Sequence, residues 1–117
     1  MAARFSTHEL DRALTRKWRE RERDRRATLA RLRDLLATAP VALSDATIFG
    51  SIVRPGAFHD RSDVDVAIPP VAPRCYFELK SYLEDGLCRE VDLVDQDRCH
   101  FAASIARDGL PWTSLAT

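Results

Sequence analysis

The 117-residue chain has little cysteine and no long hydrophobic run. Its three cysteines, Cys75, Cys88 and Cys99, are odd in number and form no C-x-x-C pair, which argues against a disulfide framework and against structural zinc. No segment approaches the roughly 20 apolar residues of a membrane span, and no apolar stretch near the N-terminus is typical of a signal peptide. We therefore expect a cytoplasmic protein with free thiols and no membrane partner.

The chain also lacks a net charge, because its 18 basic and 18 acidic residues balance. A neutral molecule has no overall field that attracts nucleic acid, so nucleic acid is not an expected partner. The charges are unevenly distributed, since the first third of the chain is rich in arginine and the remainder is acidic. The length suits one domain, and we predict a single domain over residues 1–117.

The first third of the chain predicts one long helix over residues 6–38, which ends before Pro40. Apolar residues recur at helical intervals near both of its ends: Leu10, Leu14, Trp18, Leu29, Leu32 and Leu36. Between these two groups, residues 19–26 contain no apolar side chain. We expect this polar stretch to project from the globular body or to face a partner, supported by ion pairs such as Glu22–Arg26.

The remainder of the chain predicts short strands that alternate with helices. The expected strands are residues 45–49, 63–68 and 90–94, and the expected helices are residues 51–54, 73–85 and 98–108. This order indicates an α/β (α+β) fold, in which helices flank a small mixed sheet of about three or four strands.

Two carboxylates lie one residue apart at the start of the second predicted strand. Because side chains alternate across a strand, Asp63 and Asp65 should point to the same face, roughly 6–7 Å apart at Cα. Without a cation they would repel each other, and their pKa values would rise. With Mg²⁺ their charge is neutralised, and the bound ion can contact a triphosphate. The pair therefore predicts a metal site.

A third carboxylate, Asp92, lies in the next predicted strand, between the apolar residues Val91 and Leu93. If this strand pairs beside the second one, Asp92 lies about 5 Å from one of the first two aspartates. Three carboxylates at one place suit a centre with two metal ions. Asp92 is also suitably placed to accept a proton from an attacking hydroxyl.

A Gly-Ser pair, Gly50 and Ser51, ends the first predicted strand. Glycine lets the backbone approach a phosphate closely. Ser51, at the start of a helix, offers a hydroxyl and a backbone N–H to phosphate oxygens, and Arg54 lies one turn further on as a charge-assisted donor. The segment therefore predicts phosphate binding beside the carboxylates.

Together these motifs resemble the minimal nucleotidyltransferase family of the DNA polymerase β superfamily. The resemblance covers residues 45–108, and the residues that carry it are Phe49, Gly50, Ser51, Asp63, Val64, Asp65, Val91, Asp92, Leu93 and Val94. Members of the family bind ATP with Mg²⁺ and transfer a nucleoside monophosphate to a hydroxyl. The resemblance implies a polymerase-β-like nucleotidyltransferase fold.

The resemblance also implies roles for individual residues. Those of the catalytic and metal-binding site, which would hold two Mg²⁺ ions, are Asp63, Asp65 and Asp92. Those that would contact ATP are Gly50, Ser51 and Arg54. Small members of the family resemble antitoxins that adenylylate a tyrosine of a HEPN-type ribonuclease toxin. The leading hypothesis is therefore AMP transfer from ATP to such a partner.

Two alternatives stay open. Pro55 stands before Gly56 where the family pattern has no proline, and the long helix has a polar centre. Both features motivate a catalytically weak or inactive antitoxin module that only binds its partner. The second alternative is transfer to a small molecule such as an aminoglycoside, although enzymes of that kind generally carry an additional acceptor domain. The acceptor, the nucleotide preference and homo-oligomerisation are not decided by the sequence.

Overall fold

The computed structural model describes residues 7–40, 45–97 and 102–115. Its elements, in chain order, are α1 (Thr7–Ala37), β1 (Thr47–Phe49), the 3₁₀ helix η1 (Gly50–Val53), β2 (Val64–Ile68), α2 (Pro73–Leu87), β3 (Val91–Asp95), α3 (Ala102–Asp108), β4 (Leu110–Pro111) and the 3₁₀ helix η2 (Trp112–Leu115). The strands of this part of the chain form one mixed sheet in the order β3-β2-β1-β4. Strands β2 and β3 are parallel, and the other pairs are antiparallel.

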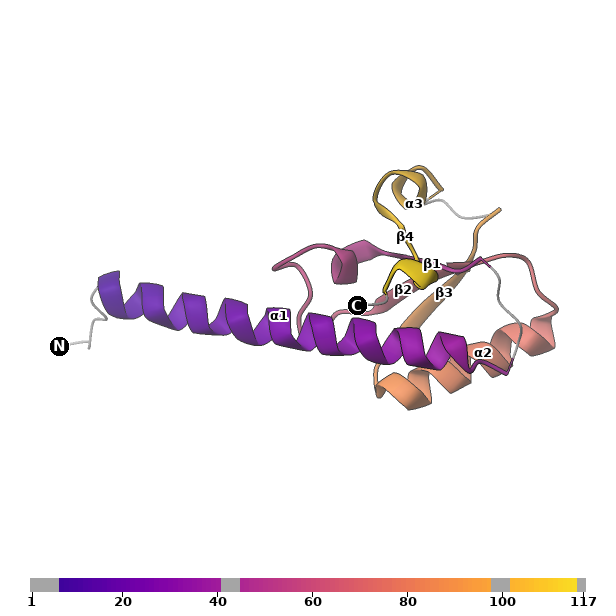
Figure 1. Cartoon of the computed structure of the whole chain (residues 1–117), viewed down its shortest axis with the longest axis horizontal. Helices are drawn as coiled ribbons and strands as arrows, with labels where there is room; N and C mark the ends of the chain where they lie inside the picture. The colour runs from indigo at the N-terminus through magenta and orange to yellow at the C-terminus, as the bar shows by residue number, and fades with distance from the viewer. Residues whose placement is uncertain (1–6, 41–44, 98–101, 116–117) are drawn as a thin grey trace.

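Helices α1 and α2 lie on one side of the sheet, and α3 lies on the other side (Figure 1). Alternation along β2 turns Val64, Val66 and Ile68 toward α1 and α2, where all three are buried. Asp65 therefore points to the opposite face. The core between the helices and the sheet consists of Leu32, Leu35, Leu36, Ala46, Ile48, Ile52, Phe58, Val64, Val66, Ile68, Leu79, Leu83, Val91 and Leu93. The α/β fold with a small mixed sheet, predicted from the sequence, is confirmed.

The predicted long helix is present as α1, which has 31 residues. Its C-terminal half packs on the core, whereas its N-terminal half extends beyond the sheet (Figure 1). Leu10, Leu14 and Trp18 are 48%, 57% and 51% exposed, so this first apolar group has no core to pack on. None of the helices in the described ranges combines the length and the apolar character that crossing a membrane requires.

Most side chains in the polar middle of α1 are exposed, but one side of this stretch packs on the rest of the chain, which was not predicted. Glu22 is only 6% exposed, and its ion pair is with Arg25 at 2.9 Å rather than with Arg26. The Gly56 N–H donates to Glu22 Oε1 at 2.6 Å, and Arg25 donates to the carbonyl of Ile52 at 3.2 Å. The hydrogen bonds from Arg25 hold the pKa of Glu22 below its ordinary value, although burial acts in the opposite direction. A buried charge is tolerated here because it is paired and hydrogen-bonded.

Residues 54–63 form the connecting loop, which joins η1 to β2. Arg89 holds this loop in place, as Glu22 does through Gly56. The Arg89 side chain is 14% exposed and lies 3.0 Å from Asp24 of α1. It donates to the carbonyls of His59 and Ser62 at 2.8 and 2.9 Å, and its guanidinium lies 4.3 Å from the centroid of the Phe58 ring. The connecting loop is therefore tied to α1 by charged groups near both of its ends.

The ends of α2 show where local signals hold and where they fail. Pro73 occupies its first turn, where a missing N–H costs no hydrogen bond. We expected the helix to end near Gly86, but it continues to Leu87, and Cys88 takes the left-handed conformation with φ 52°. Gly86 has a packing role instead, because a Cβ there would collide with the Leu35 side chain of α1. Of the last predicted helix, residues 98–101 lie outside the described part, and the remainder is α3.

Leu32→Ala is expected to lower the free energy of unfolding by about 2–5 kcal/mol, because it leaves a cavity under a fully buried position. Leu14→Ala on the same helix is the matched control. Leu14 is 57% exposed, so its removal should change stability by less than about 0.5 kcal/mol. Urea denaturation followed by circular dichroism measures both variants. Equal losses would show that the N-terminal half of α1 is buried in solution.

Candidate functional site

The parallel pairing of β2 and β3 brings two of the three predicted aspartates together. Asp65 and Asp92 are direct partners in the ladder, and neighbouring strands lie about 4.8 Å apart. Asp63 precedes β2 by one residue and is exposed, as is Asp92, whereas Asp65 is partly buried. On its other side Asp65 pairs with Phe49, the last residue of β1. The three carboxylates therefore gather beside the point where β1 ends.

The electrostatic state of Asp65 reflects this crowding. Burial, together with the negative charges of Asp92 and Asp63, raises the pKa of Asp65 from 3.8 to about 6. Within the described ranges, none of the three aspartates forms an ion pair with a basic side chain. In the described part of the chain, the site therefore holds negative charge that no ion pair compensates.

The Gly-Ser pair lies against this group of aspartates. Gly50 has φ +83°, a conformation that L side chains rarely adopt, and a Cβ at this position would overlap the Asp65 carboxylate. Only glycine lets the backbone pass this close to Asp65. Ser51 follows as a partly buried residue of η1, and its carbonyl accepts the Arg54 N–H at 3.0 Å. The predicted short helix over residues 51–54 is thus a single 3₁₀ turn that begins at Gly50.

Arg54 is less clearly a member of the site. It follows η1 in an extended conformation, and its side chain is 58% exposed. Its ion-pair partner is Asp108 at the end of α3, 3.7 Å away, rather than one of the three aspartates. An exposed pair at this distance contributes little stability, so the guanidinium is free to be redirected toward an anion. Its role in phosphate binding stays a prediction.

A polar hollow of about 310 Å³ adjoins two of the aspartates; it is lined by Asp63, Lys80, Glu84, Glu90, Val91 and Asp92. Glu84 accepts the Val91 N–H at 3.1 Å and so fixes the start of β3. Lys80, on α2, is the one basic side chain among these lining residues. Lys80 could not be selected from the sequence, because it is an ordinary polar position of an amphipathic helix.

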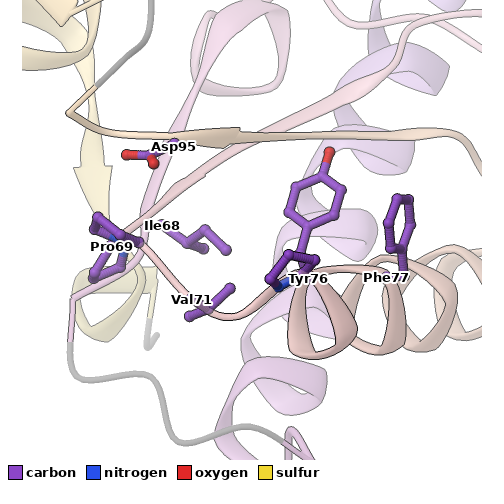
Figure 2. A pocket seen from close by; sticks show the side chains of 8 residues that line it. Ile68, Pro69, Val71, Tyr76, Phe77 and Asp95 are labelled. Carbon is purple, nitrogen blue, oxygen red and sulfur yellow. The ribbon is translucent and has the colours of Figure 1, made fainter.

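A second, mostly apolar pocket of about 300 Å³ lies near the other end of β2 and β3 (Figure 2). Its lining residues are Ile68, Pro69, Pro70, Val71, Pro73, Tyr76, Phe77 and Asp95. Ile68 is three residues beyond Asp65, which corresponds to about 10 Å along a strand. Alternation also places Ile68 and Asp95 on the opposite face of the sheet from Asp65 and Asp92. This pocket is therefore separate from the aspartates.

The carboxylates are suitable ligands for Mg²⁺, although they do not enclose a metal site by themselves. Among the described residues, no three histidine, cysteine or acidic side chains stand close enough together to hold a metal ion. Mg²⁺ is commonly bound through one or two carboxylates, with waters and substrate phosphates completing its shell. The pKa of Asp65 is raised by burial and by the charges of Asp92 and Asp63, and a bound cation would offset both effects.

No protein-family model and no curated protein matches the chain. Solved structures do match it. A toxin–antitoxin structure with AMP-PNP has a TM-score of 0.58 and 25% identity, over 72% of this chain and 71% of the other. A mutant MntA toxin–antitoxin structure has a TM-score of 0.55 and 24% identity, over 68% and 67% of the two chains. The MntA–HepT toxin–antitoxin structure has a TM-score of 0.52 and 21% identity, over 74% and 69%.

These likenesses agree with the mixed sheet and its helices. The α/β fold with a small mixed sheet, predicted from the sequence, therefore matches the fold of nucleotidyltransferase-like toxin–antitoxin proteins. The proteins that share it come from toxin–antitoxin complexes, one of them with an ATP analogue.

Asp65→Asn is expected to stabilise the protein at neutral pH. A carboxyl whose pKa is higher in the folded chain binds more protons there, so the free energy of unfolding falls as the pH rises from 3.8 to about 6. Above that window the variant should exceed wild type by on the order of 1–2 kcal/mol, and below it the two should converge. Thermal unfolding across the pH range measures the difference. Asp45→Asn, at an exposed position, is the control; the same pH-dependent gain there would contradict the assignment.

Proposed function

We propose that this chain is a Mg²⁺-dependent nucleotidyltransferase that transfers AMP from ATP to a hydroxyl group of a partner protein. The observation that carries the proposal is the pairing of Asp65 with Asp92 in adjacent parallel strands. Asp63 lies one residue before β2, and the backbone of Gly50 lies against the Asp65 carboxylate, so both belong to the same site. The likeness to a toxin–antitoxin structure with AMP-PNP supports both the nucleotide and the kind of system.

The metal and the phosphates would be held by different parts of the site. The carboxylates of Asp63, Asp65 and Asp92 would hold Mg²⁺ one or two at a time, with waters and the substrate phosphates as its other ligands. When bound, Mg²⁺ neutralises phosphate charge and stabilises the leaving pyrophosphate. Gly50 and Ser51 would approach the phosphates through the backbone and the Ser51 hydroxyl.

The transfer step assigns the proton to Asp92. The acceptor oxygen forms a bond to the α-phosphorus of ATP, and its proton passes to the Asp92 carboxylate. The bond between the α-phosphorus and the oxygen that bridges to the β-phosphate breaks, and pyrophosphate leaves. Because Asp92 is exposed, an acceptor hydroxyl can reach it from solvent.

A protein acceptor suits the position of the site. In the described sheet β3 is an edge strand, so Asp92 is approached without a neighbouring strand on that side. The adjoining hollow with Lys80 is shallow and polar, which favours an acceptor presented on a surface over an enclosed small molecule. We infer that the acceptor is a tyrosine of a HEPN-type toxin and that its modification makes this chain an antitoxin.

The double variant Asp63→Asn/Asp65→Asn is expected to lose Mg²⁺-dependent nucleotide binding, because amide groups cannot replace two anionic metal ligands. Isothermal titration with AMP-PNP and Mg²⁺ measures binding to wild type and variant. Asp60→Asn is the matched control, since Asp60 is an exposed acid of the connecting loop. Binding that survives in the double variant would refute the metal site.

Transfer itself is tested with ATP, Mg²⁺ and the candidate toxin. Wild type should add the mass of AMP to the toxin, and Asp92→Asn should slow this by at least about 100-fold, the scale of general-base catalysis. Mass spectrometry of the toxin measures the product. An unmodified toxin after prolonged incubation with wild type would reject the enzymatic role.

A second candidate function is neutralisation of a partner by binding alone. The exposed apolar residues Leu10, Leu14 and Trp18 on the free half of α1 favour it. In that case the double aspartate variant would still neutralise the toxin, whereas Leu14→Glu would not. The opposite pattern supports the enzyme.

A further inference from the structure

The polar middle of α1 was noted in the sequence and has no part in the proposed chemistry. It lies against η1 and the connecting loop, which link the Gly50–Ser51 turn to Asp63. The hydrogen bonds within the connecting loop are all short-range; among them are those from the Ala57 N–H to the carbonyl of Arg54 at 3.2 Å and from the Ser62 N–H to the carbonyl of His59 at 3.0 Å. Contacts with other elements must therefore set its position.

Glu22 makes the first of these contacts with both carboxylate oxygens. Oε1 accepts from the Gly56 N–H at 2.6 Å and from Arg25 Nε at 3.0 Å, and Oε2 accepts from Arg25 at 2.9 Å. A third nitrogen of Arg25 donates to the carbonyl of Ile52 in η1. The pair thus holds the backbone on both sides of Pro55, directly after the Gly50–Ser51 turn.

The fit between α1 and this turn is close. Gly56 has φ +81°, and a Cβ on it would come within 2.8 Å of Trp18 Nε1. Gly56 therefore rests on Trp18 while its N–H is held by Glu22. Pro55 and Gly56, where the sequence departs from the family pattern, thus lie in the part of the connecting loop that contacts α1.

The other end of the connecting loop is held through Arg89. This side chain joins Asp24 of α1 to the carbonyls of His59 and Ser62, one residue before Asp63. Each end of the segment between the predicted phosphate contacts and the predicted metal ligands is thus anchored to one stretch of α1.

We propose that Glu22 and Asp24, acting through Arg25 and Arg89, are positioning residues that fix the Gly50–Ser51 turn beside the aspartates. Within the polar stretch, Glu22, Asp24 and Arg25 are the side chains that are not fully exposed, and they are the ones with this role. The contacts described above support the role of Glu22 and Asp24 in holding the connecting loop. The consequence for nucleotide binding rests on the proposed function.

The test compares Glu22→Ala and Glu22→Gln with the control Glu20→Gln. Glu20 is an exposed acid of α1, two residues before Glu22. In Glu22→Ala the Gly56 amide should exchange with solvent deuterium at least about tenfold faster, because its buried charged acceptor is lost. AMP-PNP–Mg²⁺ affinity should fall by a similar factor at a temperature where circular dichroism shows every variant folded. Glu22→Gln keeps an oxygen acceptor and should recover part of both losses, and Glu20→Gln should match wild type.

Several results would overturn the proposal. Unchanged Gly56 exchange in Glu22→Ala would show that Glu22 does not hold the turn. Faster exchange with unchanged nucleotide affinity would reduce Glu22 to a structural residue. Should Glu22→Ala not fold, Arg25→Lys serves in its place, because lysine keeps the charge and lacks the forked guanidinium that donates to Glu22 and to the carbonyl of Ile52 together. If wild type binds no nucleotide, the proposed function fails, while the exchange of Gly56 still decides the position of the loop.

Discussion

The site depends on one constraint, the parallel register that sets Asp65 opposite Asp92. Parallel neighbours cannot be joined by a tight turn and need a crossover, which here is α2. That helix must bury its apolar side on the sheet, and Val64 and Val66 meet it from β2. Because side chains alternate, the same burial turns both aspartates to the opposite face. Packing of the core and exposure of the carboxylates are therefore two consequences of one strand pairing.

The fold was predictable where a local pattern decides it. Alternating apolar residues located the two strands that carry the aspartates, and helical spacing located α1 and α2. Strand β4 was missed because Leu110–Pro111 is too short to show a period and forms only by pairing with β1. For the polar stretch at 19–26, the packing of one side was missed, since hydropathy alone cannot show that Glu22 has a partner 34 residues away in the sequence. Burial of a paired charge is a tertiary property.

The same distinction separates the predictable from the unpredictable part of the site. Asp65 and Asp92 could be placed together because strand order and alternation leave few other arrangements. Lys80 could not be placed beside them, because it lies on α2 and no local pattern shows that this helix lines the hollow next to Asp63 and Asp92. The ion pair of Arg54 with Asp108 likewise joins η1 to a helix that comes more than 40 residues later, and no spacing rule links them.

Two partly or fully buried carboxylates in this molecule have opposite electrostatic states, and the difference distinguishes scaffold from site. Arg25 donates to Glu22, so the pKa of Glu22 is lowered despite its burial. Asp65 is partly buried and has like charges, Asp92 and Asp63, where Glu22 has a cation, so burial and then repulsion raise its pKa. The fold satisfies Glu22 with several hydrogen bonds but leaves Asp65 among like charges, which lowers the stability of the folded chain at that position. The simplest compensation is a cation that arrives with its phosphates, which is why the aspartates, without an ion pair in the described ranges, rather than the paired glutamate mark the place for chemistry.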